Sequence, residues 1–102
     1  MITNNALSEI EKISGEKLTL GNLIWSIRMC DEMNQVDFAE KLGVSRQYLC
    51  DLEHNRKSVS PKKAKQFAKK LGYSEKQFVA LAIQAIFERD GIHMEFMLKE
   101  AA

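Results

Sequence analysis

The residues with the clearest capacity for binding chemistry lie in the segment 45–54. Arg46 carries a fork of donors that matches O6 and N7 of guanine, and the amide of Gln47 matches N6 and N7 of adenine. Asp51 follows one helical turn later, where it could accept from a cytosine amine or hold Arg46 in its rotamer. Tyr48 could lie beside a phosphate or a thymine methyl, although packing explains it equally well. Side chains of these types can contact the edges of bases if a helix presents them.

The remaining reactive side chains fit neither a catalytic nor a metal-binding pattern. Cys50 and His54 stand four residues apart, a spacing that can bring two ligands together on a helix, but a zinc site needs further ligands. His54 and His93 lie in no recognisable nucleophile or acid–base motif, and no glycine-rich loop could cradle a phosphate. The sequence therefore predicts a protein that is not an enzyme and that needs no metal or cofactor.

Two short helices joined by a turn are expected to carry the segment 45–54. The side-chain oxygen of Asn34 can cap the first helix, and Gly43 can end it because glycine reaches the left-handed conformation at little cost. Ser45 can then cap the second helix. The first helix has its apolar face at Phe38, Ala39 and Leu42. Two helices joined by a short, glycine-containing turn form a helix-turn-helix.

Three further helices are expected around this motif, so the predicted fold is all-α. Thr19 opens the first of them, which has apolar residues at every third or fourth position. Ser60 caps a second helix that begins at Pro61, where the missing N–H does no harm. Ser74 and Gln77 form a capping box for the last helix.

Length and composition fit one soluble globular domain, with 102 residues, of which 45% are hydrophobic and 28% charged. The first residues lack the features of a secretory signal, and no apolar run approaches the ~18 residues of a membrane span. Cys30 and Cys50 are too few for a disulfide framework, so the expected compartment is the reducing cytoplasm. The expected organisation is an N-terminal arm or short helix at 1–18, a helix-turn-helix domain at 19–90 with its motif at 35–54, and a C-terminal tail at 91–102.

The positive charge is concentrated in one part of the chain. The whole sequence has a formal net charge of +1, but residues 46–76 hold nine Lys or Arg against three acidic residues and so carry +6. A localised basic surface is typical of a phosphate-binding face. The lysines of the segment 62–70, taken alone, are explained equally well as the solvated side of a helix.

An ordered set of residues at fixed offsets extends over roughly residues 19–74. Its members are Leu20, Gly21, Ile24, Ile27, Arg28, Gln35, Ala39, the Leu42-Gly43-Val44-Ser45 run, Leu49, Leu52, Glu53, Ala64, Ala68, Leu71 and Gly72. This set resembles the Cro/C1-type helix-turn-helix domain, the family of phage repressors and Xre-like bacterial regulators. One departure is Asn55, where the family commonly has glycine, but asparagine also tolerates the left-handed conformation.

The resemblance implies a five-helix, lambda-repressor-like DNA-binding domain. It also implies a sequence-specific regulator of transcription that binds double-stranded DNA, and we expect a repressor that acts as a dimer on a two-fold operator. The family places base contacts at the start of the second motif helix, and we assign them to Arg46, Gln47, Asp51 and Tyr48. The family also pairs the position of Arg28 with that of Glu53, a structural ion pair. The expected phosphate contacts are Gln35, Ser45, Arg56, Lys57 and Ser58.

The last helix is more apolar than one buried face requires. Its second apolar face and the tail offer a dimer or partner surface. Alternatively, the tail or the N-terminal arm folds back and covers this face. Such a surface would also suit an antitoxin that binds and neutralises a toxin protein while repressing its own operon. The residues of the surface are Val79, Ile83, Phe87, Ile92 and Phe96.

Overall fold

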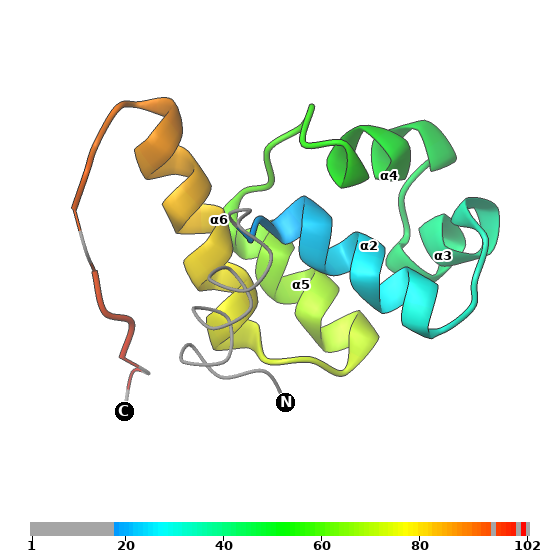
Figure 1. Ribbon diagram of the computed structural model, residues 1–102. Coiled ribbons are helices and arrows are strands. Elements are labelled where there is room, and N and C mark those ends of the chain that lie inside the picture. Colours follow the sequence, from blue (N-terminus) through cyan, green and yellow to red (C-terminus); the bar gives the residue numbers. More distant parts are fainter. Residues whose placement is uncertain (1–17, 95, 100, 102) are drawn as a thin grey trace.

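The computed structural model describes residues 18–94, 96–99 and 101. These residues form five α-helices and no strand, which confirms the predicted all-α, five-helix fold. The helices, labelled as in Figure 1, are α2 (Leu20–Cys30), α3 (Gln35–Leu42), α4 (Arg46–Glu53), α5 (Pro61–Leu71) and α6 (Glu75–Arg89). Apart from Leu18, the N-terminal arm expected at residues 1–18 lies outside the described residues.

Each helix begins after a hydroxyl or amide side chain that accepts a hydrogen bond from the backbone N–H of the third helical residue. Such a cap satisfies one of the first N–H groups, which have no partner within the helix. Gly43 ends α3 in the left-handed conformation, with a φ of 76°. The observed starts of the helices therefore agree with the predicted ones. The capping residues are Thr19, Asn34, Ser45, Ser60 and Ser74.

A single hydrophobic core holds the five helices together. α2 lies in the middle of the molecule, with α3 and α4 at one end and α6 at the other (Figure 1). Because the apolar face of every helix points into this core, the polar face of α4 is left at the surface. The largest fully buried side chains are Phe38, Phe67, Phe78, Ile24, Leu42, Leu49 and Leu52.

The backbones of α2 and α4 approach each other closely at Gly21. An ideal Cβ at this position would overlap the backbone carbonyl oxygen of Leu52 and would lie 2.7 Å from Oδ1 of Asn55. Only glycine fits such an approach without a shift of one helix. Gly21 therefore fixes how closely α4 sits on the rest of the domain.

The tail after α6 turns back along that helix (Figure 1). The N–H of Ile92 donates to the carbonyl of Phe87 at 2.8 Å, and the ring of Phe96 meets that of Phe87 edge-on, with 5.2 Å between centroids. Val79, Ile83 and Phe87 are half-buried rather than fully exposed. The tail thus covers part of the apolar face, as in the fold-back alternative. Within the described residues, no helix has the length and apolar character needed to cross a bilayer.

Candidate nucleic-acid interface

The start of α4 presents its polar side chains to solvent. The hydroxyl of Ser45 accepts from the backbone N–H of Tyr48 at 3.0 Å, which fixes the first turn of the helix. Arg46 and Gln47, the next two residues, are both exposed. The opposite side of α4 is buried through Leu49, Leu52 and Glu53. This division leaves the first turn free to enter a groove without disturbing the core.

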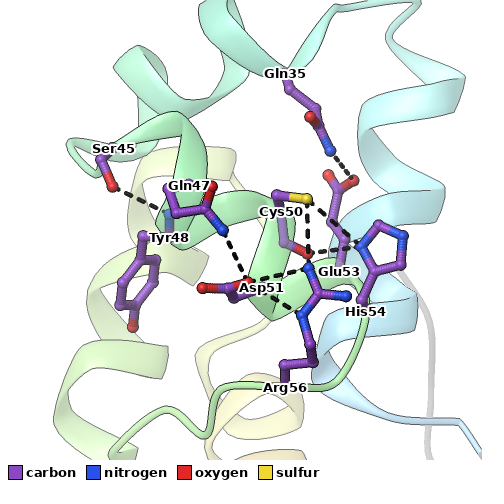
Figure 2. Close-up of polar contacts among 9 residues, drawn as sticks. All are labelled: Gln35, Ser45, Gln47, Tyr48, Cys50, Asp51, Glu53, His54 and Arg56. Carbon is purple, nitrogen blue, oxygen red and sulfur yellow. Dashed lines mark hydrogen bonds and ion pairs between the residues drawn. The ribbon is translucent and has the colours of Figure 1, made fainter.

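Asp51 connects the exposed side of α4 to the following loop. Its Oδ1 accepts from Nε2 of Gln47 at 3.1 Å and from Nε and a terminal nitrogen of Arg56 at 3.1 and 3.0 Å (Figure 2). The hydrogen bond to Asp51 raises the pKa of Arg56 above its usual value. Within the described residues Asp51 is hydrogen-bonded to Gln47 and Arg56 and not to Arg46. The spacing of residues along the chain could not predict the contact between Asp51 and Arg56. Arg56 lies after the end of α4 and reaches Asp51 only because the loop backbone turns back toward the helix.

Tyr48 is half-buried and lies under two lysine side chains. The Tyr48 ring meets the Phe67 ring edge-on, with 6.4 Å between centroids, so one side of the Tyr48 ring packs against the core. Nζ of Lys57 lies 4.7 Å and Nζ of Lys63 lies 4.3 Å from the centre of the Tyr48 ring. Neither lysine has a carboxylate partner among the described residues, so two unpaired cations gather beside the start of α4. The spacing within the segment 45–54 could not indicate the contact of Lys63 with Tyr48, because Lys63 comes from α5.

Glu53 is the buried centre of a polar contact among three helices. Its carboxylate receives two hydrogen bonds from Arg28, at 2.7 and 2.9 Å, and the side chains of Glu53 and Arg28 are 1% and 12% exposed, respectively. A terminal nitrogen of Arg28 also donates to the carbonyl of Met33 at 3.0 Å. The hydrogen bond to Glu53 raises the pKa of Arg28. The family resemblance pairs these two residues, and the structure shows that their contact joins α2 to α4.

Gln35 takes part in the same contact. Its Nε2 donates to Oε1 of Glu53 at 3.1 Å, so the side chain at the start of α3 points inward (Figure 2). The expected phosphate contact of Gln35 is therefore limited to its second side-chain N–H and to the first backbone N–H groups of α3. No local pattern indicates this hydrogen bond, because its two partners lie on different helices.

The loop after α4 exposes three of the predicted phosphate-binding residues, Arg56, Lys57 and Ser58. It begins at Asn55, whose φ of 59° confirms the predicted left-handed conformation. The side chain of Asn55 accepts from the hydroxyl of Thr19 at 2.6 Å and donates to Oδ1 of Asn22 at 3.0 Å. These contacts anchor the loop to the start of α2.

Cys50 and His54 lie close together on α4. Sγ of Cys50 is 3.7 Å from Nδ1 of His54, and the same ring nitrogen is 2.8 Å from the carbonyl of Cys50. In the part of the chain that the structure describes, no three His, Cys, Asp or Glu side chains gather as a metal site would require. The pair is thus explained by contacts within one helical turn.

Comparison with known proteins identifies a helix-turn-helix domain in this chain. A family model described as helix-turn-helix matches residues 32–78, which include α3, α4 and α5. The crystal structure of the wild-type restriction-modification controller protein C.Esp1396I matches with 28% identity and a TM-score of 0.50, over 66% of this chain and 86% of that chain. A tyrosine-to-phenylalanine mutant of the same controller protein matches with 27% identity and a TM-score of 0.51, over 70% and 90%. No curated protein matches the chain.

The matched region, residues 32–78, contains the exposed first turn of α4 and the basic residues around it. Fold, sequence and charge therefore agree on one assignment. The chain contains a helix-turn-helix domain of the Cro/C1 type and is a DNA-binding regulator of transcription.

Proposed function

We propose that the first turn of α4 enters the major groove of double-stranded DNA and that Arg46 and Gln47 read base edges there. The observation that carries this proposal is the exposure of both side chains directly after the cap at Ser45, on a helix whose other side is buried. Helix-turn-helix proteins use the start of the second motif helix in this way. Asp51 and Tyr48 lie beside Arg46 and Gln47 and complete the surface proposed to face the bases.

Phosphate contacts would surround this surface on two sides. On one side lie the loop residues Arg56, Lys57 and Ser58 together with Lys63, which shares the ring of Tyr48 with Lys57. On the other side lie the start of α3 at Gln35 and the start of α4 at Ser45, where backbone N–H groups favour anions. Contacts of this kind fix the register of a protein on DNA without reading its sequence.

We further propose that the protein acts as a homodimer on a two-fold operator and represses transcription by occupying it. Support for a dimer comes from apolar side chains that the tail leaves at the surface beside α6. Ile92, Met94 and Met97 of the tail are 37%, 68% and 92% exposed, and Val79, Ile83 and Phe87 of α6 are half-buried. A second copy would remove these side chains from water. The residues proposed for this surface remain Val79, Ile83, Phe87, Ile92 and Phe96, within a DNA-binding domain proposed to span residues 19–90.

Selection of bound sequences from a pool of random duplexes tests the function. The full chain is expected to enrich one sequence with two inverted half-sites about 10 base pairs apart, centre to centre. The similarity to a restriction-modification controller makes operators of that kind useful first competitors. Sedimentation with and without the selected duplex would then report the number of chains bound. A complex of one chain per duplex would contradict the dimer, and absence of enrichment would contradict sequence-specific binding.

The two solved structures named above are of a controller protein, so we propose a regulator of transcription in preference to an antitoxin.

A further inference from the structure

The carboxylate of Asp51 lies between a proposed base-reading residue and the basic loop. A single oxygen, Oδ1, accepts from Gln47 of the first turn and from Arg56 of the loop (Figure 2). The side chain of Asp51 is 27% exposed, whereas that of Arg56 is 54% exposed. Asp51 is therefore the inner member of this group of three.

We infer that Asp51 is a positioning residue that orients the amide of Gln47 to read adenine. The inference rests on the proposed function, in which Gln47 faces base edges. A side-chain amide has a nitrogen end with two N–H groups and an oxygen end, and a free amide can turn either end toward a given base. An ionised carboxylate only accepts hydrogen bonds, so Asp51 draws the nitrogen end of Gln47 toward itself.

The orientation leaves a defined pattern for a base. One N–H of Gln47 is used by Asp51, and the second N–H and the oxygen remain available. Adenine presents an acceptor, N7, beside a donor, the N6 amine, in the major groove. The remaining donor and acceptor of Gln47 match this pair. Guanine offers two acceptors, N7 and O6, at the same places and would leave the oxygen of Gln47 without a donor.

Arg56 reduces the electrostatic cost of a carboxylate on the proposed DNA-binding surface. The negative charge of Asp51 would be repelled by nearby DNA phosphates. The two hydrogen bonds from Arg56, at 3.1 and 3.0 Å, offset that charge and restrain the carboxylate. Three donors on Oδ1 also leave only Oδ2 for a base, which favours a positioning role over direct reading of cytosine.

A double-mutant cycle on base discrimination tests the inference. The Gln47→Ala variant first identifies the base pair at which preference depends on Gln47. The readout is then the ratio of dissociation constants for the selected duplex and for duplexes changed at that base pair. For the full-length wild type, we expect adenine to be preferred there by about five- to 150-fold. Asp51→Ala should remove most of this ratio, and Asp51→Asn, which keeps an acceptor oxygen, should retain part of it. In the Gln47→Ala background, Asp51→Ala should change the ratio no further.

Two controls separate this effect from charge and folding. Asp31→Ala removes the same charge at an exposed position between α2 and α3 and should leave the ratio unchanged. Thermal unfolding followed by circular dichroism should show that every variant is folded. A 7-deazaadenine at the selected position removes the N7 acceptor, so it should weaken wild-type binding and have little effect on Asp51→Ala.

Three results would overturn the inference while leaving the proposed function intact. The wild type could prefer a base other than adenine at the Gln47 position. Asp51→Ala could keep the full ratio, which would make Asp51 purely structural. Asp51→Ala could instead change the preference at a different base pair, which would make it a direct reader. A wild-type chain that bound no duplex would contradict the proposed function itself.

Discussion

Arg28 and Glu53 are 25 positions apart in the chain, yet their side chains form two parallel hydrogen bonds of 2.7 and 2.9 Å beneath the surface. The guanidinium lies on the middle helix, α2, and the carboxylate lies at the end of α4. Bidentate pairing fixes direction as well as distance, so this contact sets the angle at which α4 leaves the core. In the proposed function, this contact positions the start of α4 for DNA.

Removal of one member of this pair should destabilise the domain strongly. Arg28→Ala or Glu53→Ala leaves a buried charge without its partner, and we expect the free energy of unfolding to fall by ~3–5 kcal/mol. Urea denaturation followed by circular dichroism measures this change. Arg89→Ala, which removes an exposed contact of 3.4 Å with Asp90, should cost less than ~1 kcal/mol. Equal effects from the two sites would show that the buried pair does not fix α4.

Gly21→Ala should also destabilise, although alanine is the better helix former. In an exposed helix interior this substitution would raise stability by ~0.5–1 kcal/mol. At Gly21 the added methyl overlaps the carbonyl of Leu52, and we expect a loss of at least ~1–3 kcal/mol. Ser26→Ala, on the exposed side of α2, provides the matched control and should change stability by less than ~0.5 kcal/mol. A stabilised Gly21→Ala variant would disprove the close approach of α2 and α4.

Asn55 should tolerate glycine better than alanine. Both substitutions remove the hydrogen bonds to Thr19 and Asn22, but alanine must in addition adopt a φ near 59°. The left-handed conformation costs a residue with a Cβ ~1–2 kcal/mol, so Asn55→Ala should be less stable than Asn55→Gly by about that amount. Thermal unfolding of the two variants decides the question. Equal stabilities would mean that backbone strain at this position is unimportant.

Lys57→Ala and Lys63→Ala should weaken binding to every duplex in the same proportion. Each substitution removes a cation beside the Tyr48 ring, and the loss of one phosphate interaction should lower the slope of log affinity against log salt by about 1. Titrations of selected and scrambled duplexes at several salt concentrations measure the slope. Lys76→Ala, at the start of α6, is the control. A Lys63→Ala variant with an unchanged slope would remove Lys63 from the phosphate-binding surface.

Local features of this fold were predictable from sequence, whereas contacts between helices were not. Caps such as Ser45 and turns such as Gly43 depend on a few neighbouring residues, so their positions were predicted correctly. The partners of Asp51 and Gln35 depend on how a loop or a second helix returns to α4, and no spacing encodes that return. The contact of Lys63 with Tyr48 was not predictable either, because Lys63 lies on α5 and its side chain extends to the Tyr48 ring on α4.

The tail illustrates a different limit. The apolar character of α6 indicated that its second face needs a cover but not which cover it receives. The contact between Phe87 and Phe96 shows that the tail supplies part of it. A hydrophobic pattern specifies burial without specifying a partner, since the driving force has no direction.

The most direct measurement of the central claim compares the wild type with the double variant Arg46→Ala, Gln47→Ala. Fluorescence anisotropy would give the affinity of each for the selected duplex and for a scrambled duplex of the same composition. Both side chains are exposed, so the variant should remain folded and keep its affinity for scrambled DNA apart from the effect of the one charge removed. We predict that its preference for the selected duplex falls by ~1–3 kcal/mol for each residue removed. An unchanged preference would show that the start of α4 does not read the DNA sequence.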